Sequence, residues 1–219
     1  MLGRSIGLNS VLLALFAVLT TAIIAGTFLG TRDRIAAAQR AAEEKALLEI
    51  VPATRHDNAM LDDTIPVGPA DSLLRLKQDK QIYVARQGGD VVAVILPVTA
   101  PDGYSGTIEL IVGINRDGSV AGVRALQHRE TPGLGDKVDI KKSDWILDFD
   151  GRRLGEPPAE QWAVKKDGGV FDTFTGATIT PRAVTAAVKR GLEYFEANRE
   201  LLLSPAVLAA NNGAGGDNG

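Results

Sequence analysis

The chain has 219 residues, with 24 lysines and arginines against 27 aspartates and glutamates, which gives a formal net charge of −3. This balance excludes the basic footprint of a nucleic-acid-binding protein, and the length fits one modest domain with appendages. There is no cysteine and there are two histidines. Disulfides, thiolate metal sites and cysteine nucleophiles are therefore excluded, and a histidine-rich metal site is not expected. Any redox chemistry would need an organic cofactor.

The first predicted element is a membrane-spanning helix. After a short segment, residues 1–9, an apolar run without any charged residue extends from Val11 to Gly30. Because about twenty residues cross a bilayer core as a helix, we assign a transmembrane helix to residues 10–30. The alternative is a cleaved signal peptide, whose apolar region is shorter, roughly 7–15 residues. The small residues Ala25-Gly26-Thr27 keep that alternative open.

Charge does not fix the orientation of this helix. Arg4 and the amino terminus lie on one side of the apolar run, and Arg32, Arg34 and Arg40 lie on the other. The positive-inside rule therefore does not favour a cytoplasmic amino terminus. The orientation has to come from another source.

A helical stalk and linker are predicted for residues 31–78. Residues 34–50 are rich in Ala, Glu, Leu and Arg, which are good helix formers, and Pro52 is expected to end that helix. Residues 57–68 are acidic and turn-prone, which is typical of a linker, and residues 72–77 are expected to form a helical turn.

Residues 79–203 are predicted to form an α+β domain, an antiparallel sheet flanked by helices. Alternating segments separated by turns predict its strands, and these are residues 81–85, 91–98, 107–115 and 119–127. Later elements are a short helix, a last strand, a carboxy-terminal helix and a disordered tail, at residues 141–149, 162–164, 181–203 and 204–219. The two tryptophans, Trp145 and Trp162, are expected in the core.

The loop that leads into the carboxy-terminal helix is the main candidate site. Thr180 followed by Pro181 indicates an N-cap and a first-turn proline. Thr178 therefore lies just ahead of a helix amino terminus, where unpaired N–H groups and the helix dipole favour a phosphate. Gly176 and Ala177 are small, so a bulky group could approach the backbone closely.

This loop resembles the flavinylation motif of the FMN-binding domain family, Asp-x-x-Ser/Thr-Gly-Ala-Thr. The matching residues are Asp172, Thr175, Gly176, Ala177 and Thr178. The resemblance implies that Thr178 carries FMN through a phosphoester bond. It also implies that a separate flavin transferase, which needs Mg²⁺, installs the FMN from FAD.

A second stretch carries the same resemblance. Residues 128–137 form an irregular, charged loop that contains the apolar Leu134. All six positions of the family signature Glu-Thr-Pro-Gly-Leu-Gly are present at residues 130–135, which include Glu130, Thr131 and Gly133. We expect this loop to contact the flavin ring, with Leu134 as the apolar face and Thr131 as a hydrogen-bonding group. His128 is either a pH-sensitive group beside the ring or, more commonly for a lone histidine, structural.

The phosphate of the expected FMN would lie near the N–H groups of residues 180–183. Lys137 and Arg182 are candidate charge partners for it. Asp172 carries the same sign of charge as a phosphate, so its expected role is recognition by the transferase or its metal. No group in the chain is expected to activate the Thr178 hydroxyl, so we predict no catalytic residue and no metal ligand.

The plan of the whole chain resembles the G subunit of the Rnf ion-translocating electron transport complexes. The related C subunit of the Na⁺-translocating NADH:quinone reductases has the same plan, although it is usually longer. The resemblance implies an electron-transfer subunit between donors of the ferredoxin or NADH type and their acceptors, with other integral membrane subunits as partners. It also implies a single-pass protein of the bacterial inner membrane whose FMN domain faces the periplasm. Two alternatives remain, a non-redox accessory or sensor domain and a stand-alone periplasmic flavoenzyme.

Overall fold

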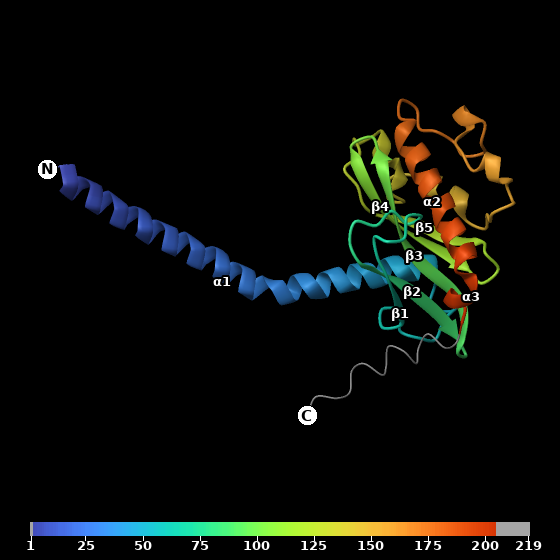
Figure 1. Ribbon diagram of the computed structural model, residues 1–219, viewed down its shortest axis with the longest axis horizontal. Coiled ribbons are helices and arrows are strands. Elements are labelled where there is room, and N and C mark those ends of the chain that lie inside the picture. The colour runs from blue at the N-terminus through green and yellow to red at the C-terminus, as the bar shows by residue number, and fades with distance from the viewer. Residues whose placement is uncertain (1, 205–219) are drawn as a thin grey trace. The chain divides into compact units, whose positions relative to one another are not determined.

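The computed structural model describes residues 2–204 and separates the chain into two compact units (Figure 1), residues 1–45 and residues from Ala46 onward. The predicted disordered tail, residues 204–219, lies outside the described residues except for its first residue. The first unit belongs to a single long helix. The second unit contains the sheet and the remaining helices.

Helix α1 (Leu2–Ile50) joins three predicted segments into one element, namely the short amino-terminal segment, the membrane helix and the stalk helix. By length and composition it could span a membrane. Within its apolar part, the hydroxyls of Thr20 and Thr27 donate hydrogen bonds to the carbonyls of Phe16 and Ile23, at 2.9 and 2.8 Å. These hydroxyls are satisfied inside the helix, as a lipid environment requires.

The second unit is built on five antiparallel strands in the order β1-β2-β3-β4-β5. The four predicted strands are confirmed; the first three are longer than expected, and the fourth begins one residue later. Residues 57–68, expected to be a linker, contain a further strand, because Thr64–Val67 pairs with the start of β2. The sequence did not indicate this strand, because it is only four residues long and contains Pro66. The proline is tolerated because β1 lies at the edge of the sheet. The strands are β1 (Thr64–Val67), β2 (Lys80–Gln87), β3 (Asp90–Gly103), β4 (Gly106–Asn115) and β5 (Val120–Gln127).

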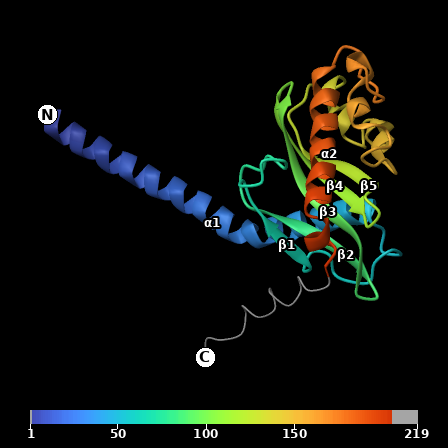
Figure 2. The ribbon, with the colours of Figure 1, turned by 45° about the vertical axis from the view of Figure 1, so that its right-hand side comes forward.

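Helix α2 (Ile179–Ala197) packs on one face of this sheet, where it runs over β3 and β4 (Figures 1 and 2). It buries Val184, Val188 and Leu192, which recur at helical spacing and join the main apolar core. The predicted helix of residues 181–203 is instead two elements. Helix α2 ends at Ala197, and the short helix α3 (Arg199–Leu202) follows.

The last turn of α1 covers part of the opposite face, and this contact depends on two glycines. Gly113 of β4 and Gly122 of β5 are register partners. A Cβ at Gly113 would overlap the Cγ2 atom of Ile50, and a Cβ at Gly122 would lie 3.4 Å from it. Ile50 therefore fits a notch formed by paired glycines. It joins a second apolar cluster with Leu47.

Between β5 and α2 the chain forms loops and short 3₁₀ helices: η1 (Gly135–Val138), η2 (Asp144–Phe149), η3 (Ala159–Gln161) and η4 (Lys165–Asp167). The helix predicted at 141–149 is thus a shorter 3₁₀ helix. The strand predicted at 162–164 is wrong, because only an isolated bridge joins Val164 to Phe171. Residues 72–75 form a turn without helix. Both tryptophans are buried in an aromatic core cluster, as predicted.

Candidate functional site

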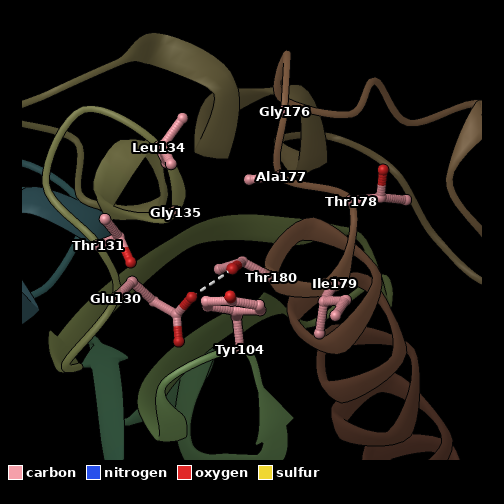
Figure 3. Close-up of a pocket in the computed structure, with 10 residues that line it drawn as sticks. All are labelled: Tyr104, Glu130, Thr131, Leu134, Gly135, Gly176, Ala177, Thr178, Ile179 and Thr180. Atoms are coloured by element: carbon pink, nitrogen blue, oxygen red, sulfur yellow. Dashed lines mark hydrogen bonds between the residues drawn. The ribbon is translucent and has the colours of Figure 1, made fainter.

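A cavity of about 290 Å³ lies at the amino-terminal end of α2. Three segments that are distant in the sequence line it (Figure 3): the tip of the β3–β4 hairpin, the loop after β5, and the loop that enters α2. The lining residues are Tyr104, Glu130, Thr131, Leu134, Gly135, Gly176, Ala177, Thr178, Ile179 and Thr180.

Glu130 holds these three segments together. The residue is 5 % exposed. Its Oε1 accepts a hydrogen bond from the Ser105 N–H at 2.9 Å, and its Oε2 accepts one from the Thr180 hydroxyl (Figure 3). A Cβ at Gly135 would lie 2.6 Å from Glu130 Oε2 and 2.8 Å from Thr180 Oγ1. Only glycine fits beside this pair.

Helix α2 begins earlier than the sequence indicated. Thr180 was expected to be the N-cap, but it is fully buried inside the first turn. Its hydroxyl donates a hydrogen bond to Glu130. The N-cap position belongs to Thr178, whose side chain makes no capping hydrogen bond. The error arises because the partner of Thr180 is fifty residues away in sequence.

Thr178 is half-buried, and no hydrogen bond engages its hydroxyl among the described residues. The expectation that the N–H groups of residues 180–183 would bind the phosphate must be revised. Pro181 has no N–H, and the Arg182 N–H already donates to the Thr178 carbonyl at 3.3 Å. The first-turn groups without an intrahelical acceptor are those of Ile179 and Thr180. The helix dipole adds positive potential at the same place.

Apolar side chains form the rim of the cavity and are unusually exposed. Tyr104 is 68 %, Ile179 43 % and Leu134 41 % exposed. Gly176 has a φ of +80°, in the left-handed region that favours glycine, and a Cβ there would meet only Leu134 Cδ2, at 3.6 Å. The site thus combines an uncovered apolar rim with a free hydroxyl at a helix amino terminus.

The structure brings together six of the eleven predicted cofactor-binding residues around this cavity: Glu130, Thr131, Leu134, Gly176, Ala177 and Thr178. The other five do not line it: Gly133, Lys137, Asp172, Thr175 and Arg182. The predicted cofactor-binding residues did not include Tyr104, Gly135 or Ile179, and Thr180 was expected only as the N-cap and through its backbone N–H. Gly135 was visible as the last position of the second signature. Nothing in the spacing pointed to Tyr104, at a hairpin tip.

Two of the predicted charged residues have other partners. The Arg182 guanidinium binds the Asp167 carboxylate at 2.6 and 2.8 Å, and these hydrogen bonds lower the pKa of Asp167 and raise that of Arg182. Asp172 forms an ion pair with Lys165 at 2.7 Å. Both pairs are exposed, so either could exchange its partner at little cost.

His128 lies beside the site without lining it. Its Nδ1 accepts a hydrogen bond from the Glu130 N–H at 3.3 Å. In this position it supports the backbone of the loop that carries Glu130, which is the structural role left open by the sequence.

Comparisons with known proteins agree with this arrangement. Residues 103–193 match the model of the FMN-binding domain, and residues 1–50 match that of the RnfG N-terminal region. Relatives named as the G subunit of an ion-translocating oxidoreductase complex include one from Pseudomonas aeruginosa, 50 % identical over 208 residues, which cover 95 % of this chain and 97 % of the relative. A relative of the same name from Shewanella loihica is 49 % identical over 201 residues, which cover 92 % and 94 %.

Proposed function

The chain belongs to the family of G subunits of ion-translocating oxidoreductase complexes, and from this premise we propose that it is an electron-transfer subunit that carries FMN covalently on Thr178. The observation that carries the proposal is the position of Thr178. Its hydroxyl is free at the N-cap of α2 and lies at the edge of a cavity lined by both signature stretches.

The residues around the cavity suit FMN. An isoalloxazine ring is planar and largely apolar, and Tyr104, Leu134 and Ile179 offer exposed apolar surface on different sides (Figure 3). A phosphate attached at Thr178 would meet the N–H groups of Ile179 and Thr180. The cavity, about 290 Å³, is at the small end of ligand sites. The ring would stay partly exposed, as an electron carrier requires.

The chain does not activate Thr178 by itself. The carboxylate in the cavity, Glu130, is already bound to Thr180 and Ser105, and a threonine hydroxyl is a weak nucleophile without a base. As the family resemblance implies, a flavin transferase would form the phosphoester from FAD: the Thr178 oxygen would bond to the phosphorus of the FMN part, and AMP would leave. Asp172, exposed in the same loop, is available for recognition by that enzyme.

When bound, FMN accepts and donates one or two electrons. The protein positions the ring, because the hairpin tip, the loop after β5 and the start of α2 are tied together by Glu130. Helix α1 anchors the domain in the bacterial inner membrane beside other membrane subunits, with the FMN domain on the periplasmic side. The single apolar helix found in the described part of the chain supports a single-pass anchor, and the side of the membrane is proposed from the family resemblance.

The proposal is tested in the native host with Thr178→Ala and with Thr173→Ala as the matched control. Both threonines lie in the same loop, but Thr173 does not line the cavity. We expect a fluorescent band on an unstained denaturing gel for the wild type and for Thr173→Ala, and none for Thr178→Ala. Retained fluorescence in Thr178→Ala would overturn the attachment site.

A further inference from the structure

A second cavity, of about 250 Å³, lies on the sheet face opposite α2. Thr107 and Glu109 of β4 line it, whereas the alternate residues Ile108 and Leu110 join the core under α2. The cavity lies beyond the part of this face that the last turn of α1 covers. Its lining is polar: Lys77, Ser105, Gly106, Thr107, Glu109, Gln127 and Arg129.

The cavity carries excess positive charge. Glu109 is neutralised by Lys80, with 3.3 Å between Nζ and Oε2. Lys77 donates a hydrogen bond to the Thr107 hydroxyl at 2.7 Å and has no carboxylate partner among the described residues. Arg129 is exposed, and no hydrogen bond or ion pair engages it within the described part of the chain. Two unneutralised cations therefore face one cavity in a chain whose net charge is −3.

This cationic cavity is directly adjacent to the proposed FMN cavity. The two share no lining residue, but Tyr104 and Glu130 line one while their chain neighbours Ser105 and Arg129 line the other. The hydrogen bond from the Ser105 N–H to Glu130 Oε1, 2.9 Å long, crosses the wall between them. A group bound on the cationic side would thus lie one layer of residues away from the flavin.

We propose that this cavity docks an acidic segment of the protein that exchanges electrons with the flavin, with Lys77 and Arg129 binding its carboxylates. The inference rests on the proposed function, because it gives a partner to the same site. Electron-transfer contacts between proteins are small, and complementary charges guide such partners and fix their register. Arginine is favoured at interfaces and binds carboxylates with two parallel hydrogen bonds.

The first test is zero-length cross-linking with a carbodiimide in native membranes, which joins carboxylates to lysine amines. We expect a flavin-fluorescent adduct of higher mass that is lost in Lys77→Arg, since arginine keeps the charge but does not react. Lys142→Arg, at an exposed lysine outside the cavity, should keep the adduct. The absence of an adduct that depends on Lys77 would overturn the docking site.

The second test measures electron transfer through the membrane complex at low and high salt. Charge reversal at both positions, Lys77→Glu with Arg129→Glu, should slow transfer at low salt by about tenfold or more, and the difference should shrink at high salt. Arg55→Glu is the control, because Arg55 binds Asn115 at the opposite end of β4. An equal effect of Arg55→Glu would overturn the proposal.

Failure of the docking site is distinguishable from failure of the proposed function. The subunit is detected both by flavin fluorescence and by an antibody to an epitope tag. A subunit without fluorescence in the wild type contradicts the covalent FMN. A fluorescent subunit that forms no adduct through Lys77 contradicts the docking site alone.

Discussion

Two places in the domain use glycine for opposite purposes. In the notch of Gly113 and Gly122, the missing side chains make room for Ile50 of the same chain. In the cavity at the start of α2, Gly176 borders open space, with Leu134 Cδ2 as the single neighbour of an added Cβ. The notch is filled by the protein itself, whereas the cavity leaves apolar surface for another molecule. Stability should therefore depend mainly on the notch, and flavin retention on the cavity.

The largest expected effect on stability comes from Ile50→Ala. Ile50 is 3 % exposed and packs in the glycine notch, so its truncation leaves a void and should lower the free energy of unfolding by about 2–5 kcal/mol. Covalent flavin should remain. Denaturant unfolding in detergent, followed by tryptophan fluorescence, measures the change, because both tryptophans lie in the domain core. Leu13→Ala, at an exposed residue of α1, is the control and should not alter the transition.

The same substitution at two glycines sharpens the comparison. Gly113→Ala overpacks Ile50 and should cost about 1–3 kcal/mol without loss of flavin. At Gly176 an added Cβ would make only an ordinary contact with Leu134 Cδ2, at 3.6 Å, so Gly176→Ala should cost only about 1 kcal/mol for the left-handed backbone. It should nevertheless reduce the fraction of flavinylated protein, since its methyl enters the loop next to Thr178. Equal flavin content in both variants would contradict the proposal that the notch determines stability and the cavity determines flavin retention.

Much of the contrast between the glycine notch and the cavity could not be predicted from the sequence. The strands β2 to β5 and the helix after Thr178 follow from alternation and helical spacing, so the α+β class was predictable. Gly113 and Gly122, in contrast, resemble strand-weakening residues until the register shows that they face each other and Ile50. A cross-strand pair of this kind cannot be found by local periodicity.

The candidate site shows the same limit. Thr178 and Glu130 could be identified because each lies in a recognisable motif. The bond between Glu130 and Thr180 is a tertiary contact, and it overrode the local preference of Thr180 for an N-cap. Tyr104 lies at a hairpin tip, where the sequence has no periodic pattern that would identify a site residue. Arg182 was expected near a phosphate because of its helical position, but the nearby Asp167 binds it.

Glu130 links the cavity to the stability of the domain. Glu130→Ala would leave the Ser105 N–H and the buried Thr180 hydroxyl without their acceptor, which should cost about 1–2 kcal/mol. Glu130→Gln keeps one acceptor oxygen and should cost less. We expect both variants to hold covalent flavin, with a looser ring in Glu130→Ala, measured as a faster decay of flavin fluorescence anisotropy. A stable, unchanged Glu130→Ala would show that Glu130 does not tie the segments together.

The smallest expected effect tests whether the notch or an ion pair holds the end of α1. Arg124 binds the Glu49 carboxylate at 3.1 Å and the Glu49 carbonyl at 3.3 Å. The Glu49 side chain is 39 % exposed, so water can replace the guanidinium. Arg124→Met keeps the apolar stem and should cost less than about 1 kcal/mol, with little dependence on salt. A loss as large as that of Ile50→Ala would mean that charge, not the fit of Ile50 between two glycines, attaches this helix end to the sheet.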